Sequence, residues 1–236
     1  MTTRRNALVL LGAGLLAACE TVDASVLDGV LGGTGGAGLS AAEVAVGLKA
    51  ALDNGVGNAL GELGVVDGFL GDPVVRIPLP GALRDVRGVL APLGADGLLV
   101  ELEQQLNRGA EAAVPVARDI FVDAVRGLTI QDALGILRGP DTAATDYLRE
   151  RTGASLAELF APIMRGALSD TGALRLVDEV ERAVPLGLTG DLKADLVRHG
   201  VDYGLRGVFH YIGEEEAAIR RDPAKRTSEI LRRVFG

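Results

Sequence analysis

The chain has 236 residues, of which 48% are hydrophobic and 24% charged, so its composition is that of a globular protein and excludes an intrinsically disordered one. Its formal net charge of −8 argues against nucleic acid as a partner, and with 3% aromatic residues and no Trp the stacking surfaces that hold single strands or sugars are scarce. The single cysteine excludes an intramolecular disulfide and a cysteine-based metal site, and we expect no cofactor.

The start of the chain has the pattern of a bacterial secretory signal. Arg4 and Arg5 form a short basic region, and the apolar run that follows is too short to cross a bilayer as a permanent helix. The run ends at Leu16-Ala17-Ala18-Cys19, which resembles the lipobox of bacterial lipoproteins, where the cysteine is acylated and becomes the new N-terminus. We therefore predict a signal peptide over 1–18 and a lipid anchor on Cys19. The alternative is that Cys19 is only a small residue beyond an Ala-rich cleavage site.

The same region bears on export and location. Residues 3–8 partly resemble a twin-arginine signal, but Ala7 stands where that signal carries an aromatic or large apolar residue, so we favour the general secretory route and keep the twin-arginine route as the alternative. By resemblance to the sorting rules of Gram-negative lipoproteins, Glu20 after the cysteine permits transport to the outer membrane. We expect a protein of the cell envelope, held by its lipid on the periplasmic face of the outer membrane.

Residues 19–39 are predicted to form a flexible tether. Six of the ten residues from Gly29 to Gly38 are Gly, a composition that resists packing. Gly33, Gly35 and Gly38 match the glycine spacing of a dinucleotide-binding loop, but such a loop needs buried parallel strands beside it, and the sequence predicts none. The tether interpretation leaves residues 40–236 as a single domain.

The domain is predicted to be all-α, with about eight to ten helices. Ser40 and Glu43 have the spacing of a capping box, and an apolar residue then recurs every four positions, which predicts a first helix that ends near Gly64. The one extended candidate is Val74 to Pro80, where prolines bar both a regular helix and a central strand.

Two helices are predicted before the middle of the chain. One covers 83–93, and the other begins at Leu98. Pro115 either kinks this second helix or starts a new one, and the helical pattern ends at Gly127.

Caps and breakers divide the rest of the domain into further predicted helices. The start signals are serine, threonine and aspartate in cap positions and proline in a first turn. The predicted helices are one from Thr129 through Leu137, one from Asp141 through Arg151, one from Ser155 with Glu158 as its capping partner and Pro162 as a kink, and three over 174–184, over 191–221 and from Pro223 onward.

Short sequence motifs along the domain are shared with a known family. They are Gly47-Leu48-Lys49 with Leu52, Asp67-Gly68-Phe69-Leu70, Arg76-Ile77-Pro78-Leu79-Pro80, Asn107-Arg108 with Ala110-Glu111, Asp132-Ala133, Ile136-Leu137-Arg138-Gly139-Pro140-Asp141, Ala143-Ala144-Thr145 with Tyr147, Glu214-Glu215-Glu216, Arg226-Thr227 and Val234-Phe235-Gly236.

On these residues the chain resembles the bacterial helical lipoproteins known as domain of unknown function 4197 (DUF4197), from about Gly47 to Gly236. The resemblance implies an all-helical envelope protein and brings no activity or ligand with it. Gly109 and Leu148 stand where the family usually has Ala and Phe, so we expect local packing to differ there.

Asn107, Arg108 and Glu111 are the first candidate site. Asn107 and Glu111 lie one turn apart on one side of a predicted helix with small neighbours, so their side chains can point inward. One interpretation is a structural hydrogen-bond network that ties helices together. The other is a polar anchor inside a largely apolar ligand cavity.

Arg76, Asp141 and Thr145 are the remaining candidates. Arg76 lies in the proline-rich segment, which can fix its guanidinium for a carboxylate or phosphate ligand or for an ion pair within the protein. Asp141 and Thr145 either contact a ligand or cap a helix. Glu214-Glu215-Glu216 is interpreted as a solvated stretch of helix.

Motifs for metal and nucleophilic chemistry are missing. His199 and His210 lie about 16 Å apart along one predicted helix and cannot share a metal, so both are interpreted as partly buried core or groove residues. The chain contains neither a His-Glu-x-x-His nor a Gly-x-Ser-x-Gly sequence.

Two functional hypotheses follow. The first is a non-catalytic envelope lipoprotein that binds a lipid, another apolar ligand or a protein partner. The alternative is a hydrolase-type enzyme with a carboxylate-rich pocket around Glu111, Asp123 or Asp132, acting on envelope lipids or polymers, whose signature would be converging acids with raised pKa values.

Overall fold

We describe the protein from a computed structural model. The chain divides into two units, 1–38 and 39–236, and all described residues belong to the second. The parts of the chain that the structure describes are residues 39–85, 96–170, 192–222, 226 and 232–233. Within them only helices and connecting loops occur, so the all-α prediction is confirmed there.

Several sequence predictions fall on other residues. The signal peptide, Cys19 and the tether lie outside the described residues, as do the helices predicted over 174–184 and most of those predicted over 83–93 and from Pro223. For the helix predicted over 83–93, the structure describes only residues 83–85, which belong to α3 (Gly81–Asp85).

The first described helix, α2 (Ala41–Leu63), begins and ends where the sequence predicts. Its capping box is formed, because the Ser40 hydroxyl accepts the N–H of Glu43 at 3.2 Å and the Glu43 carboxylate accepts the N–H of Ser40 at 2.8 Å. Gly64 caps its C-terminal end. The predicted apolar stripe is buried throughout, at Val44, Leu48, Leu52, Val56 and Leu60.

A helix interrupted by proline forms the next long element. α5 (Asp96–Ala113) ends just before a single 3-10 turn, η2 (Pro115–Ala117), and α6 (Arg118–Arg126) continues to Gly127. Pro115 therefore starts a new helix, which settles the choice that the sequence left open. α7 (Ile130–Arg138) follows, with Thr129 as its predicted cap.

α8 (Ala143–Asp170) is one continuous helix of 28 residues, and the predicted break between Arg151 and Ser155 is wrong. Thr152 is compatible with the helix interior because its hydroxyl donates to the Leu148 carbonyl oxygen at 2.7 Å. The buried residues Leu148, Leu156 and Phe160 form a continuous apolar face, and their packing outweighs the capping signal at Ser155.

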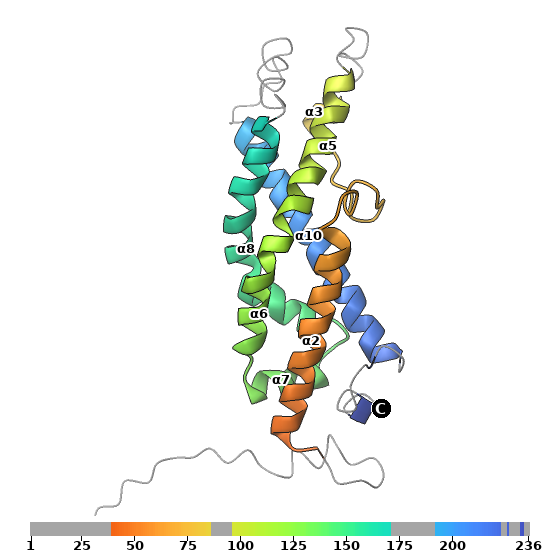
Figure 1. Cartoon of the computed structure of the whole chain (residues 1–236), viewed down its shortest axis with the longest axis vertical. Coiled ribbons are helices and arrows are strands. Elements are labelled where there is room, and N and C mark those ends of the chain that lie inside the picture. Colours follow the sequence, from red (N-terminus) through yellow and green to blue (C-terminus); the bar gives the residue numbers. More distant parts are fainter. Residues whose placement is uncertain (1–38, 86–95, 171–191, 223–225, 227–231, 234–236) are drawn as a thin grey trace, which may run out of the picture. The chain divides into compact units, whose positions relative to one another are not determined.

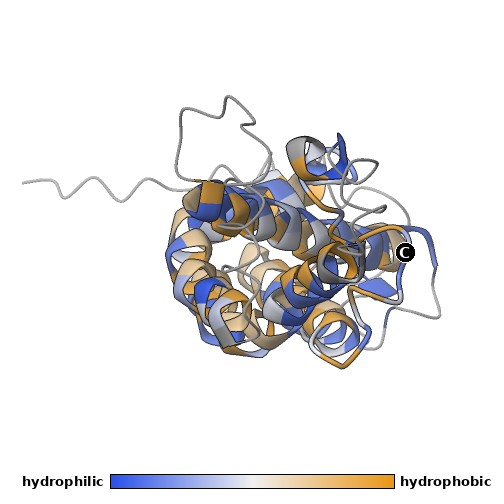
Figure 2. Ribbon diagram, turned by 90° about the horizontal axis from the view of Figure 1, so that it is seen from above, coloured by the Kyte–Doolittle hydropathy of each residue, from blue (hydrophilic) through white to orange (hydrophobic). Residues whose placement is uncertain are grey.

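The last long helix, α10 (Leu192–Arg221), lies within one residue of the predicted bounds at its start and matches them at its end. Figure 1 shows α2, α5, α8 and α10 side by side, and in the end-on view of Figure 2 the helices surround one interior. A single apolar cluster fills that interior, and its largest fully buried rings are Phe69, Phe121 and Phe160. None of the described helices is both long and apolar enough to cross a membrane.

Three helices meet closely at Gly109, Met164 and Gly200, on α5, α8 and α10. A Cβ atom at Gly109 would lie 2.7 Å from the Met164 sulfur, and one at Gly200 would lie 2.8 Å from the same atom. Met164 thus occupies the space that the two glycines leave free. This contact accounts for the glycine at position 109, where the resembling family usually has Ala.

Candidate functional site

The predicted site residues on α5 bind a loop of the protein itself. The Glu111 carboxylate is 5% exposed, and one of its oxygens accepts the N–H groups of Phe69 and Leu70 at 3.1 and 3.2 Å. Its other oxygen accepts from Arg108 at 2.6 Å, and Arg108 also donates to Asp67 at 2.7 Å. The hydrogen bond to Glu111 raises the pKa of Arg108 above its usual value. These bonds hold the turn in which Asp67 adopts a positive φ of 67°.

Asn107 fastens the extended segment that follows this turn. Its side chain is fully buried, its oxygen accepts the Ile77 N–H at 2.8 Å, and its amide donates to the carbonyl oxygens of Ile77 and Glu103 at 2.9 and 2.7 Å. The side-chain amide of Asn107 thereby pairs with both the N–H and the carbonyl oxygen of Ile77, as a neighbouring strand would in a sheet. We call Asn107, Arg108 and Glu111 with their partners the α5 network, and it fits the structural interpretation of these residues.

Arg76 forms an ion pair at the edge of the α5 network and contacts none of Asn107, Arg108 and Glu111 through its side chain. Its Nε donates to the Glu103 carboxylate at 2.9 Å, and its side chain is 49% exposed. It also borders a small pocket against α10. Of the two predicted roles, the ion pair within the protein is therefore present.

Thr145 lies in a second polar cluster, at the start of α8. The N–H groups of Ala144 and Thr145 donate to the two oxygens of Glu216 at 3.0 and 2.9 Å, and the Thr145 hydroxyl donates to it at 2.8 Å. Arg220 pairs with the same carboxylate at 2.9 Å. Asp141 is exposed in the preceding turn, and its predicted role as the cap of this helix is wrong because Glu216 of α10 binds these first-turn N–H groups.

The interpretation of Glu214-Glu215-Glu216 as a solvated stretch is wrong for Glu216, which is 7% exposed. The sequence contains a signal for this. Gly204, Val208, Ile212 and Glu216 recur every four residues on the buried face of α10.

The two histidines differ in their surroundings. His199 is partly buried, and its Nε2 donates to the Pro78 carbonyl oxygen at 2.7 Å, while burial lowers the pKa of its imidazole. His210 is exposed and borders the pocket that includes Arg76. In the described parts of the chain, no group of three or more His, Cys, Asp or Glu side chains is placed to hold a metal ion.

The acids of the enzyme hypothesis have separate local roles. Asp123 is 79% exposed and faces Arg126 at 3.8 Å. Asp132 completes a capping box by accepting the N–H of Thr129 at 2.9 Å, and this bond lowers the pKa of Asp132 instead of raising it. Glu111 lies in the α5 network. The three carboxylates thus have different partners on different helices.

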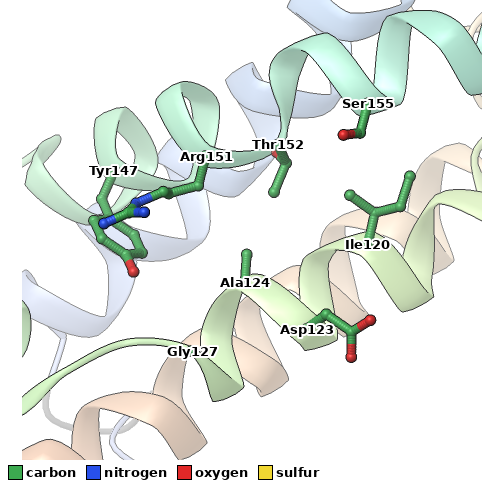
Figure 3. Close-up of a pocket in the computed structure, with 8 residues that line it drawn as sticks. All are labelled: Ile120, Asp123, Ala124, Gly127, Tyr147, Arg151, Thr152 and Ser155. Carbon is green, nitrogen blue, oxygen red and sulfur yellow. The ribbon is translucent and has the colours of Figure 1, made fainter.

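An open groove of about 410 Å³ lies between α6 and α8 and is drawn in Figure 3. We call it the α6–α8 groove. One side is formed by residues spaced three or four apart on α6 and the other by residues spaced in the same way on α8, so each helix presents one face. The lining residues are Ile120, Asp123, Ala124, Gly127, Tyr147, Arg151, Thr152 and Ser155.

One end of the α6–α8 groove is polar. The Arg151 guanidinium lies 5.5 Å from the centre of the Tyr147 ring, and it forms no salt bridge with any carboxylate among the described residues. Burial and the charge of Asp132 raise the pKa of the Tyr147 hydroxyl, while Arg151 lowers it, and the protonated hydroxyl can donate a hydrogen bond. In Figure 3 Asp123 points away from α8, so it does not neutralise Arg151.

The other part of the groove combines apolar side chains with the hydroxyl of Ser155. Ile120 and Ala124 line it from α6, and Thr152 lines it from α8. Because the Thr152 hydroxyl is bonded within its own helix, Thr152 presents its methyl group to the groove (Figure 3). The sequence analysis missed this site, although the spacing of Tyr147, Arg151 and Ser155 by four residues indicates a shared helix face.

Comparison with known proteins identifies a family. The model of a family described as "Protein of unknown function (DUF4197)" matches residues 38–236. No curated protein and no solved structure matches the chain. The match spans the whole helical unit and confirms the resemblance found in the sequence motifs.

Proposed function

Since this chain belongs to the DUF4197 family, whose function is unknown, its role has to be inferred from its own geometry, and we propose that it is a non-catalytic, lipid-anchored envelope protein that binds a small anionic amphiphile in the α6–α8 groove. The observation that carries the proposal is the Arg151 guanidinium, which forms no salt bridge among the described residues, beside Tyr147 at one end of a groove that Ile120 and Ala124 line further along.

The size of the groove suits a small molecule. Ligand sites in proteins commonly measure about 300–1,000 Å³, and the groove measures about 410 Å³. By contrast, the pocket that Leu48, Ala144 and Ile219 line holds about 20 Å³, which is room for about one water molecule. An apolar ligand therefore fits the groove better than it fits this interior site.

The polar end favours an anionic head group. A guanidinium offers a planar fork of donors that matches a carboxylate or phosphate, and the Tyr147 hydroxyl adds a further donor. The apolar part of the ligand would then lie against Ile120, Ala124 and the methyl group of Thr152. A ligand with a charged head and a short alkyl chain satisfies both halves of the site.

The anchor belongs to the same proposal. A lipid on Cys19 and a tether over 19–39 would keep the groove close to a membrane surface, where anionic amphiphiles are found. Metabolic labelling with a palmitate analogue tests this part separately. The label is expected on the wild-type protein and not on Cys19→Ala.

Calorimetric titration with octanoate tests the groove. The full chain carrying Cys19→Ala is used, so that no anchored lipid competes with the probe. We expect Arg151→Gln to weaken octanoate binding about tenfold, which corresponds to about 1.4 kcal/mol. Octanol, which lacks the charge, should bind the variant and the parent protein equally.

Arg149→Gln is the matched control, because Arg149 lies on the same helix, pairs with Asp146 and does not line the groove. It should change the octanoate affinity less than twofold. The proposal fails if the parent protein does not bind millimolar octanoate, or if the two arginine variants lose affinity equally.

A further inference from the structure

A second pocket, which shares no residue with the α6–α8 groove, lies between the extended segment and α10. It measures about 170 Å³, and we call it the α10 pocket. Arg76 lines it from the extended segment, and Tyr203, Arg206 and His210 line it from the helix. The three helix residues are spaced by three and four positions, so α10 presents them on one face.

Close contact at Gly207 forms the floor of the α10 pocket. A Cβ atom at this position would lie 2.7 Å from the Phe69 ring and 3.2 Å from the Cβ of Val75. Only a glycine allows the α10 backbone to approach the segment so closely. This approach brings Arg206, the preceding residue, to the same pocket as Arg76.

The guanidinium groups of Arg76 and Arg206 are each held by one contact and keep N–H donors that can bind a ligand. Arg76 is fixed by Glu103 through Nε, so its two terminal nitrogens can still donate to a ligand. The Arg206 guanidinium lies 4.4 Å from the centre of the Tyr203 ring, which restrains it through a cation–π contact. Arg206 forms no salt bridge among the described residues.

The pocket is basic although the chain carries a net charge of −8. None of its lining residues is a carboxylate. Asp72, just before the extended segment, accepts the Tyr211 hydroxyl and the Val74 N–H, and its charge also acts on His210. The acid nearest in sequence on the helix, Asp202, is exposed one turn before Arg206.

From this arrangement we infer that the α10 pocket binds a phosphoryl group, with Arg76 and Arg206 donating from opposite walls and the imidazole of His210 from the rim. A phosphoryl group presents three outer oxygens, which Arg76, Arg206 and His210 can share, and the Tyr203 hydroxyl is a fourth donor in the lining, whereas a carboxylate has only two oxygens. The group belongs either to a free phosphate or to the ester of a lipid head group. This site is independent of the function proposed for the α6–α8 groove.

Calorimetric titration of the full chain with two probes tests the inference. Inorganic phosphate stands for the free ion, and glycerol 3-phosphate stands for a lipid head group. Tighter binding of glycerol 3-phosphate would identify an ester as the ligand, and equal binding would identify the phosphoryl group alone, so both results support the site. Failure of both probes to bind at millimolar concentration would overturn it.

Variants on α10 separate a built site from general attraction to positive charge. Arg206→Gln is expected to weaken phosphate binding about tenfold, and Arg206→Lys should restore part of it. Arg198→Gln is the matched control, because Arg198 is exposed on the same helix and pairs with Asp195. It should change affinity less than twofold, and an equal loss in both glutamine variants would contradict the inference. Arg151→Gln should leave phosphate binding unchanged, which keeps the two sites distinguishable.

Discussion

The α5 network and the α6–α8 groove both contain an arginine on a helix face, yet the two arginines differ in their partners. Arg108 is bonded to Glu111 and Asp67, and through Glu111 it supports a loop. Arg151 lies beside the ring of Tyr147 and feels the charge of Asp132, but it forms no salt bridge among the described residues. Polar side chains that are spaced to point inward thus stabilise the fold of this protein, and the donors left for a ligand lie on a face between two helices.

Removal of Glu111 should give the largest loss of stability. Glu111→Ala leaves the N–H groups of Phe69 and Leu70 without their acceptor and Arg108 without its buried partner. We expect the free energy of unfolding to fall by about 4 kcal/mol, measured by urea denaturation. Glu101→Ala, at an exposed position of the same helix, should change it by less than about 0.5 kcal/mol. Similar losses in both variants would remove the distinction between network and surface.

The second largest effect is expected at Glu216. Glu216→Gln keeps the shape of the side chain and removes the charge that Arg220 and the first turn of α8 share. The free energy of unfolding should fall by about 2 kcal/mol. Glu214→Gln, an exposed neighbour, is the control and should behave like the wild type in the same urea titration. A stable Glu216→Gln protein would show that the cap contributes nothing.

Local and long-range hydrogen bonds differ in how well the sequence predicts them. Ser40 with Glu43 and Thr129 as the cap of α7 were predictable because cap and partner lie within one turn. Glu216 and the N–H of Thr145 are 71 residues apart in the chain, so no local pattern joins them. The inward direction of Asn107 and Glu111 followed from helical spacing, but their partner, the 69–77 segment, is fixed only by tertiary packing.

The candidate site was less predictable than the fold for the same reason. The α6–α8 groove exists because α6 and α8 lie side by side, and each helix alone shows only an ordinary mixed face. The predicted break inside α8 also divided Tyr147 and Arg151 from Ser155, which the continuous helix places on one face.

A helix cap gives a smaller effect. Thr129→Ala removes the hydroxyl that accepts the Asp132 N–H at 3.1 Å. We expect a loss of about 1 kcal/mol in the free energy of unfolding. Thr129→Ser keeps the hydroxyl and should recover most of this loss in parallel urea titrations. If the serine variant is as unstable as the alanine variant, the cap is not the cause.

The smallest effect concerns pH. Burial lowers the pKa of His199 below its ordinary value of 6.5, against the opposing bond to Pro78 and the charge of Asp202, and Arg206 and Arg84 lower it further. The unfolded chain therefore binds this proton more readily than the folded one. The contribution of neutral His199 to stability is complete above pH 6.5 and is lost as the pH falls through the lower, folded-state pKa.

Urea titrations at several pH values between 7.5 and 5 measure this loss. His199→Gln should show a flatter dependence of unfolding free energy on pH than the wild type. His210→Gln, which removes the exposed histidine, should keep the slope of the wild type. Equal slopes for wild type and His199→Gln would contradict the assignment.

Thermal melting with and without octanoate tests the distinction between the two regions most directly, because a ligand that binds only the folded state raises the melting temperature. Without octanoate, Arg151→Gln and Arg149→Gln should melt within about 1 °C of the parent protein, since neither arginine is buried in a network. With octanoate, the parent protein and Arg149→Gln should melt at higher temperature, and Arg151→Gln should not. An equal rise in all three proteins, or a melting temperature of Arg151→Gln that is several degrees lower without ligand, would contradict the account.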